Sequence, residues 1–325
     1  MNIEKYLNQL GENSVAASNK IKSLTLDEKN SLLESISKCI IEDRSEIIKA
    51  NNKDVEEAKE KLSKSMIDRL QLNDERIDGI IQSIKTVISL PDPIGNILFT
   101  NTRPNGMKVE RVSVPLGVVG IIYESRPNVT VDASILCLKS GNSVILRGGS
   151  ESFNSNLQLV KSMQRACGNI GLDKNTIQFI ETTDRSAVDY MLSKMSDYID
   201  VVVPRGGKGL VKKVQESAKI PVIGHLDGIC HIYVDESSDP ETASKIVTNA
   251  KLRRTSICGA AETVLIDEKC IDSHLPKIIN DLKSGGCEIR GDEKCKEKFN
   301  EVTLASDDDW KTEYLDAIIS IKIVN

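Results

Sequence analysis

Apolar residues in the first part of the chain, up to about residue 90, recur at helical spacing. Thr25 followed by Glu28 is the pattern of a capping box and predicts the start of a helix. The apolar residues behind it keep the i, i+3/i+4, i+7 period of an amphipathic helix: Leu32, Leu33, Ile36, Cys39 and Ile40. Two more helices are predicted over 54–62 and 75–90. The second of these ends before Pro91, because proline cannot continue a helix.

Beyond Pro93 the pattern changes to short segments. Residues 108–115 alternate between apolar and polar, which predicts a half-buried strand. Val- and Ile-rich runs then alternate with helical segments; the runs cover 117–124, 143–149, 176–182 and 199–207, and the helices 129–141, 154–168 and 185–193. Wholly apolar strands alternating with helices predict an α/β fold with a parallel sheet covered on both faces.

The same alternation continues in the last third of the chain. Two strands are predicted within 220–235, followed by a helix over 240–253 and a strand from Glu262. A helix around 274–284 and a final strand over 317–324 complete the pattern. A length of 325 residues exceeds one ordinary core. We therefore expect two domains.

Composition narrows the class of protein. Hydrophobic residues make up 39% and charged residues 28% of the chain, as in a soluble globular protein. A net charge of -5 and an aromatic content of 3% argue against a nucleic-acid partner. There is no signal-peptide pattern and no apolar run of about 18 residues. Eight cysteines without a C-x-x-C pair favour reduced thiols in the cytoplasm, and the three histidines are not at zinc-ligand spacing.

Two turns combine arginine with glycine at the ends of predicted strands. They are Arg147-Gly148-Gly149-Ser150 and Arg205-Gly206-Gly207. In a parallel sheet, ligands bind at the carboxyl ends of strands, where glycine allows close approach and helix N-termini favour anions. A single Arg-Gly-Gly motif is most simply interpreted as a tight turn whose arginine is solvated. Two of them favour a phosphorylated cofactor, and the cation after the strand favours NADPH over NADH.

Cys258 lies in the segment RRTSICGAAE, between Arg253-Arg254 and a run of small residues. A nucleophilic thiol needs groups that favour the thiolate and room for an acyl group. The arginines supply positive charge, and the Gly-Ala-Ala run could begin a short helix whose amides face the sulfur. Spacing alone still favours a buried, inert thiol, which is the usual state of a free cysteine.

Long segments of the chain resemble the gamma-glutamyl phosphate reductases, a family of the aldehyde dehydrogenase superfamily. The segments are 115–156, 200–210, 221–235 and 248–265, with further matches at 89–95 and 313–324. They occur in the family's order and extend nearly from end to end. The resemblance implies an NADPH-dependent reduction of L-glutamyl 5-phosphate to L-glutamate 5-semialdehyde, with release of phosphate, in proline biosynthesis.

The resemblance also implies roles for individual residues. Cys258 matches the catalytic nucleophile that forms a thioester, and Asn128 matches the residue that stabilises the oxyanion. The implied cofactor-binding residues are Arg147, Gly148, Gly149, Ser150, Gly206, Gly207 and Glu313, and the implied substrate anchors are Arg126 and Arg254. The resemblance also implies two domains. Residues 1–231 form a helical N-terminal region and an NADPH-binding domain, with a hairpin near 100–115, and residues 232–325 form the catalytic domain.

Two departures from the superfamily are informative. Aldehyde-oxidising members carry a glutamate that activates water where this chain has His225. Its absence favours transfer of the thioester to hydride, with no proton donor identified. The family also continues beyond the position of Asn325, so a C-terminally truncated chain with an incomplete catalytic domain is expected.

The sequence leaves two alternative functions open, and the resemblance implies partners. An aldehyde-oxidising semialdehyde dehydrogenase and a truncated, non-catalytic relative are the alternative functions. If the chain is full length, the resemblance implies a homo-oligomer. It also implies that the substrate is handed over by glutamate 5-kinase.

Overall fold

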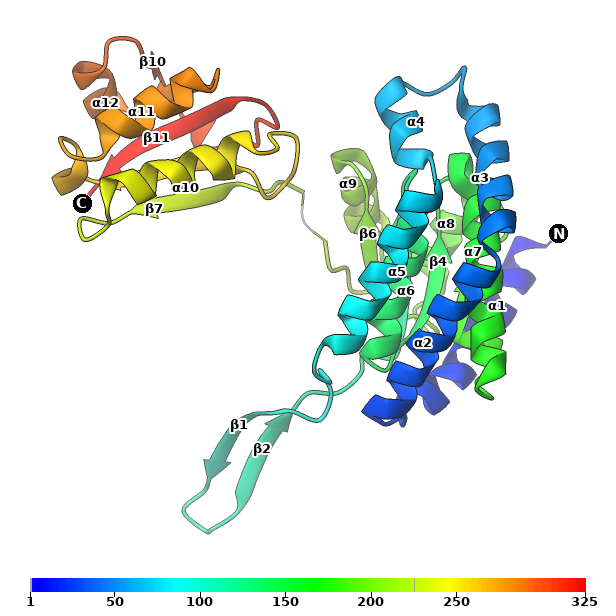
Figure 1. Ribbon diagram of the computed structural model, residues 1–325. Helices are drawn as coiled ribbons and strands as arrows, with labels where there is room; N and C mark the ends of the chain where they lie inside the picture. Colours follow the sequence, from blue (N-terminus) through cyan, green and yellow to red (C-terminus); the bar gives the residue numbers. More distant parts are fainter. Residues whose placement is uncertain (1, 225) are drawn as a thin grey trace. The chain divides into compact units, whose positions relative to one another are not determined.

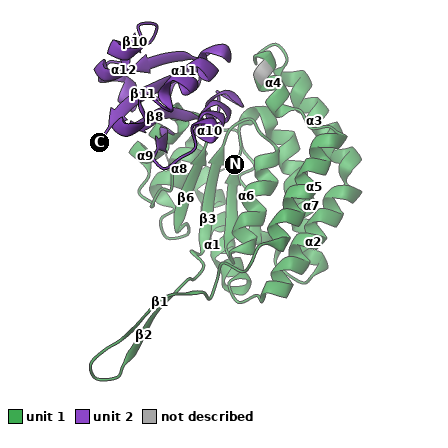
Figure 2. Ribbon diagram, turned by 60° about the vertical axis from the view of Figure 1, so that its left-hand side comes forward, with its two compact units in different colours: residues 1–224 green, residues 225–325 purple. Residues whose placement is uncertain are grey.

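The structure, a computed structural model, describes residues 2–224 and 226–325 (Figure 1). The chain divides into two compact units, unit 1 over residues 1–224 and unit 2 over residues 225–325 (Figure 2). The boundary expected after residue 231 falls inside strand β7 (Cys230–Val234). Because β7 pairs along its length with a strand of unit 2, the whole strand belongs there and the boundary comes earlier.

Five helices form the N-terminal region of unit 1. They are α1 (Ile3–Ile21), α2 (Leu26–Glu42), α3 (Arg44–Ala58), α4 (Lys64–Leu70) and α5 (Asp74–Ser89). The capping box is confirmed, since the Thr25 side chain accepts from the Glu28 amide and the Glu28 carboxylate accepts in return. The helix predicted over 54–62 was misplaced. Those residues hold the end of α3, whose buried face includes the polar Asn51 and Asp54 and so lacks a clear apolar period.

A parallel four-stranded sheet forms the centre of unit 1. Its strands are β3 (Val118–Tyr123), β4 (Ser143–Arg147), β5 (Ile177–Phe179) and β6 (Val201–Arg205), in the order β5-β4-β3-β6. The helices between and after them are α6 (Asn128–Lys139), α7 (Phe153–Asn169), α8 (Ser186–Lys194) and α9 (Lys208–Ser217). The α/β prediction is confirmed. Of the two strands expected within 220–235, the first is only an isolated bridge between Val202 and Val222.

Alternate residues of β3 belong to different apolar cores. Val119 and Ile121 join the core shared with α2, α5, α6 and α7, whereas Val118 and Ile122 join the core shared with α1 and α8. Successive side chains of a strand point to opposite faces, so a strand covered on both faces must be apolar at every position. This explains the unbroken Val- and Ile-rich runs.

The hairpin of β1 (Ile97–Thr102) and β2 (Lys108–Val112) extends away from the helices of unit 1 (Figure 1). Every residue of both strands is exposed. The hairpin near 100–115 is therefore present, but the expectation of a half-buried strand was wrong. Alternation predicts which side chains share a face, and here no other element of the described chain covers either face.

Unit 2 is a second parallel sheet with helices. The sheet has the order β10-β9-β11-β8-β7, with β8 (Ala261–Asp267), β9 (Glu288–Gly291), β10 (Thr303–Leu304) and β11 (Ile318–Val324). Its helices are α10 (Pro240–Leu252), α11 (Leu275–Ser284) and α12 (Glu293–Lys298). Short 3-10 turns occur in unit 1 at Ser150–Ser152 and Lys174–Thr176, and in unit 2 at Glu268–Cys270 and Asp309–Lys311. No helix in the described part of either unit is long and apolar enough to cross a membrane.

Candidate active site

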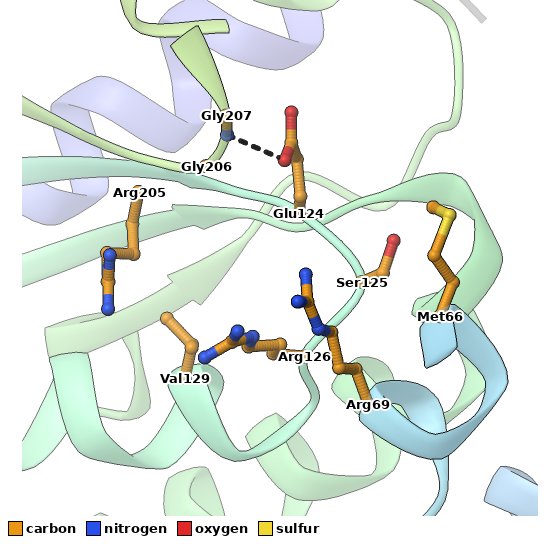
Figure 3. A pocket seen from close by; sticks show the side chains of 9 residues that line it. All are labelled: Met66, Arg69, Glu124, Ser125, Arg126, Val129, Arg205, Gly206 and Gly207. Atoms are coloured by element: carbon orange, nitrogen blue, oxygen red, sulfur yellow. Dashed lines mark hydrogen bonds between the residues drawn. The ribbon is translucent and has the colours of Figure 1, made fainter. Parts of the chain in front are cut away.

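A pocket in unit 1 opens at the carboxyl ends of β3 and β6 (Figure 3). The strand order reverses between these two strands, which is where ligands bind in open α/β sheets. The cavity has a volume of about 220 Å³ and is lined by Met66, Arg69, Glu124, Ser125, Arg126, Val129, Arg205, Gly206 and Gly207. The predicted turn after β6 and the predicted anchor Arg126 thus share one pocket.

Glycine at position 206 lets a carboxylate hold the turn after β6. The Gly207 amide donates to Glu124 Oε2 at 2.9 Å (Figure 3). A Cβ on Gly206 would lie 2.6 Å from the Glu124 carboxyl carbon and 2.8 Å from a methyl of Leu210. Helix α9 begins directly after this turn, so its N-terminal amides border the pocket. The sequence analysis did not predict α9, because its residues are mostly polar.

Three arginines line the pocket from separate parts of the chain. Arg205 ends β6, Arg126 follows β3, and Arg69 belongs to the short helix α4. In Figure 3 the Arg126 guanidinium lies beside Val129, and the side chains of Arg205 and Arg69 lie to either side of it. One carboxylate of the lining, Glu124, is engaged by the Gly207 amide. The pocket therefore suits a ligand with more than one negative charge. Arg69 carried no signal in the sequence, since α4 resembles any exposed charged helix.

The turn after β4 is closely packed around its two glycines. A Cβ on Gly148 would lie 2.1 Å from the Asn156 amide nitrogen and 3.0 Å from the Tyr123 ring. A Cβ on Gly149 would lie 3.1 Å from the Ser125 amide nitrogen. The loop after β4 is therefore packed closely against the loop after β3 at Gly149 and against Asn156 and Tyr123 at Gly148.

Glu151 connects these two loops. Its carboxylate accepts hydrogen bonds from the Ser125 and Ser150 hydroxyls. Burial acts to raise the pKa of Glu151, but these hydrogen bonds and nearby Arg147 outweigh it and lower the pKa. The carboxylate is therefore held ionised beside the glycine turn.

Arg147 is buried and is not the solvated arginine of the simplest interpretation. Its guanidinium donates to the carbonyl of Gly148 and, at 3.2 Å, to that of Thr183. Burial lowers the pKa of this guanidinium. The side chain braces the turn after β4 against the loop after β5.

Asn128 is the first residue of α6 and is half-buried. Its amide donates to Asp132 Oδ2 at 2.9 Å. Burial raises the pKa of Asp132, and the hydrogen bond from Asn128 counters this. The amide that the sequence assigns to an oxyanion thus has a carboxylate partner within its own helix.

All eight cysteines lie within the described residues, and Cys258 is the only exposed one among them. Cys230 is half-buried and six are buried: Cys39, Cys137, Cys167, Cys270, Cys287 and Cys295. Burial raises the pKa of Cys137 and that of Cys167 to about 12, which keeps these thiols unreactive. The structure therefore excludes the buried-thiol interpretation for Cys258.

The segment around Cys258 is a turn. The expected short helix after the thiol is absent: Ala260 donates to the carbonyl of Ile257 at 2.9 Å, and β8 begins at Ala261. The turn leaves too few residues before the strand for a helix. The side chains of Arg253 and Arg254 are both exposed.

Gly228 brings Cys258 and Glu313 close together. These residues precede β7, β8 and β11, which are neighbours in a parallel sheet, so all three lie at its amino edge. A Cβ on Gly228 would lie 2.5 Å from the Cys258 carbonyl oxygen, 3.0 Å from its Cβ and 3.1 Å from Glu313 Oε1. Cys258 and Glu313, two predicted site residues, thus both approach Gly228, for which the sequence carries no motif.

Comparisons with known proteins show the family to which this chain belongs. The aldehyde dehydrogenase family pattern matches residues 5–295. Gamma-glutamyl phosphate reductase from Brucella suis is 46% identical over 99% of this chain and 77% of its own length. This chain belongs to the gamma-glutamyl phosphate reductase family. The enzyme of that name from Paramagnetospirillum magneticum is 48% identical over 99% of this chain and 76% of its own length. The crystal structure of the Thermotoga maritima enzyme matches with a TM-score of 0.88 and 44% identity, covering 98% of this chain and 77% of that one.

Aldehyde dehydrogenases use a nicotinamide cofactor, and the residues of unit 1 fit one. Glycines 148 and 206 stand where a Cβ would collide with neighbouring side chains, so glycine is what permits these tight turns at the ends of β4 and β6. A cationic pocket beside the first amides of α9 suits a pyrophosphate. Both features lie at the carboxyl edge of the sheet, as in dinucleotide-binding folds.

We predict that Gly228→Ala lowers kcat/KM by about 10²-fold, because the added methyl must displace the Cys258 segment or the Glu313 carboxylate. Gly259→Ala is the matched control, since a Cβ there meets nothing within 4 Å. The measurement is steady-state kinetics on both variants, with circular dichroism to compare their folding. Equal activity of the two variants would contradict the close packing described here.

Proposed function

We propose that this chain reduces L-glutamyl 5-phosphate to L-glutamate 5-semialdehyde and releases phosphate. The exposed Cys258 beside the Glu313 carboxylate is the observation that carries the proposal. Membership of the gamma-glutamyl phosphate reductases, at 46–48% identity to relatives of that name, supplies the substrate. The reaction belongs to proline biosynthesis, as the resemblance implies, and we propose that it occurs in the cytoplasm.

The Cys258 thiolate attacks the acyl carbon, the bond from that carbon to the phosphate oxygen breaks, and a thioester remains on the enzyme. The Asn128 amide would stabilise the oxyanion that forms during the attack. When bound, the cofactor supplies the hydride. The thioester carbon that accepts this hydride then carries an oxyanion; its carbon–sulfur bond breaks, which returns the Cys258 thiolate and releases the aldehyde. Exposure of Cys258 gives the acyl group the access that this chemistry needs.

We propose NADPH as the reductant. The residues that would hold it are the turn Arg147-Gly148-Gly149-Ser150, the turn Gly206-Gly207 and Glu313. Because the Arg147 guanidinium is engaged by backbone carbonyls, a 2′-phosphate would have to meet another cation or the amides of the turn. The ratio of kcat/KM for NADPH and NADH measures this preference directly.

The arginine pocket supports recognition of a phosphorylated ligand. Arg126 and Arg254 are the substrate anchors that the resemblance implies, and Arg126 lines the pocket with Arg69 and Arg205. We propose that Arg69 belongs to the same set. Three arginines that line one cavity match the charge of an acyl phosphate or of a cofactor pyrophosphate.

An aldehyde-oxidising activity is the second candidate. His225, which replaces the hydrolytic glutamate of such enzymes, lies outside the described residues. The two activities differ in their need for phosphate: the reductase in reverse consumes semialdehyde, phosphate and NADP⁺ together. Formation of NADPH from semialdehyde and NADP⁺ without phosphate would favour the oxidising enzyme.

We propose that the chain acts as a homo-oligomer and receives its substrate from a kinase such as glutamate 5-kinase. The exposed hairpin supports the first proposal. Large apolar side chains on it are more than half exposed: Ile97, Leu98, Phe99 and Met107. A surface of this kind is typical of an interface. An acyl phosphate must come from a phosphoryl transfer to a carboxylate, which supports the proposal that a kinase supplies the substrate.

We predict that Cys258→Ser lowers kcat by at least about 10³-fold, because a serine hydroxyl at this turn is a far weaker nucleophile than a thiolate. The measurement is NADPH formation from semialdehyde, NADP⁺ and phosphate. Cys230→Ser is the control, since Cys230 is the other partly accessible thiol. It should retain most of the activity. Normal turnover of the Cys258 variant would exclude the thioester mechanism.

We predict that Arg69→Gln raises the KM for the phosphorylated substrate or the cofactor by about tenfold, since a hydrogen bond to a charged group is worth about 1.5–3 kcal/mol. Lys64→Gln is the matched control, because Lys64 is an exposed cation of the same helix that does not line the pocket. Separate KM values for each ligand show which of them Arg69 meets. Unchanged values for both would remove Arg69 from the site.

A further inference from the structure

A buried ion pair closes the two ends of the Cys258 segment. Lys251 Nζ and Glu262 Oε2 are 2.5 Å apart, and both side chains are fully buried. Lys251 is in the last turn of α10, and Glu262 is the second residue of β8. Cys258 lies on the stretch of chain between them. The residues 253–259 are largely exposed, so the buried anchors of this stretch are its ends.

The same lysine also meets the Glu313 segment. Its Nζ lies 5.8 Å from the centre of the Tyr314 ring, and the Arg290 guanidinium lies 5.1 Å from that ring. A cation within about 6 Å of an aromatic ring is attracted to its face. Tyr314 directly follows Glu313, so one buried cation contacts both the thiol segment and the carboxylate segment.

Tyr314 is itself held at its hydroxyl. The hydroxyl lies 2.7 Å from Asp309 Oδ1 and 2.7 Å from Ser320 Oγ. Asp309 receives a second hydrogen bond from Arg290 at 2.6 Å. Burial, together with the Asp309 carboxylate, raises the pKa of Tyr314 to about 12. The ring therefore remains a neutral phenol with a fixed orientation.

The backbone beside Tyr314 is in a sparsely populated conformation. Leu315 has φ 55°, in the left-handed region that residues other than glycine rarely adopt. Such a conformation persists when the surrounding contacts determine it. The contacts of the Tyr314 side chain are the ones next to Leu315 in the chain. They fix the segment that positions Glu313.

Stability alone does not account for this arrangement. Two well-packed apolar side chains often serve as well as, or better than, a buried ion pair. Glu262 Oε1 is buried and has no hydrogen-bond partner among the described residues, which adds to the cost. What an apolar pair does not provide is a fixed distance between charged groups and a cation facing the Tyr314 ring.

We propose that Lys251, paired with Glu262, is a positioning residue that holds the Cys258 and Glu313 segments at one mutual distance. The inference rests on the proposed function, in which the two segments serve one reaction. The contact around Gly228 is where that distance matters, since Cys258 and Glu313 Oε1 both approach it closely. Loss of the cation frees both segments together.

The test compares three variants of the full chain. Lys251→Met removes the charge and keeps the stem, Lys251→Met/Glu262→Leu replaces the pair by apolar groups, and Lys245→Met is the matched control on the exposed face of α10. Thermal unfolding, kcat and KM are measured for each. We expect the double variant to unfold near the wild-type temperature while its kcat stays about 10²-fold low at nearly unchanged KM.

Hydrogen exchange gives a readout that does not depend on turnover. In Lys251→Met we expect the amides of 253–260 and 311–317 to exchange faster together, by about tenfold, and the control to match wild type. A double variant that regains kcat with its stability, or faster exchange in one segment alone, would overturn the proposal. If wild-type protein reduces no acyl phosphate, the proposed function fails, and the exchange data still decide whether Lys251 couples the segments.

Discussion

Parallel strand pairing is the constraint on which the candidate functional residues of each unit depend. In a parallel sheet every strand presents the same end to the same edge, so loops that are distant in sequence must meet there. In unit 1 the loops after β3, β4 and β6 meet at the carboxyl edge and form the arginine pocket and the glycine turns. In unit 2 the segments before β7, β8 and β11 meet at the amino edge and bring Cys258 to Glu313. The rule that ligands bind at carboxyl edges identifies the loops of unit 1, but it does not identify the segments of unit 2.

The second shared feature of the two units is the close approach of glycine backbone to neighbouring atoms. Gly206, Gly148 and Gly228 each stand where a methyl group would collide with a functional or supporting atom. The neighbouring polar groups are then held by hydrogen bonds or ion pairs, such as Glu124 with the Gly207 amide and Lys251 with Glu262. Small residues supply the space, and buried charges fix what surrounds it. Within each unit we expect the chemistry to depend on both.

Much of the fold and part of the site could be predicted from local pattern. The capping box at Thr25 and the Val- and Ile-rich strands act through neighbouring residues, and the structure confirms them. The hairpin strand was predicted as half-buried, because alternation does not say whether a second layer exists. Arg147 was predicted to bind the cofactor, and nothing in the sequence of the turn shows that its guanidinium donates to backbone carbonyls. The boundary between the units was misplaced, because strand pairing, not composition, assigns β7.

The sequence by itself determined the α/β alternation and the family, and it predicts Cys258 as the nucleophile, since these depend on periodicity and on long ordered motifs. Only the tertiary structure decided that Cys258 is exposed while six other cysteines are buried. It also placed Arg69 beside Arg126, Gly228 against Glu313, and Lys251 between Glu262 and Tyr314. The physical reason is the same in each case. Burial and contact across strands depend on which segments the sheet brings side by side, and residues far apart in the chain carry no local record of that pairing.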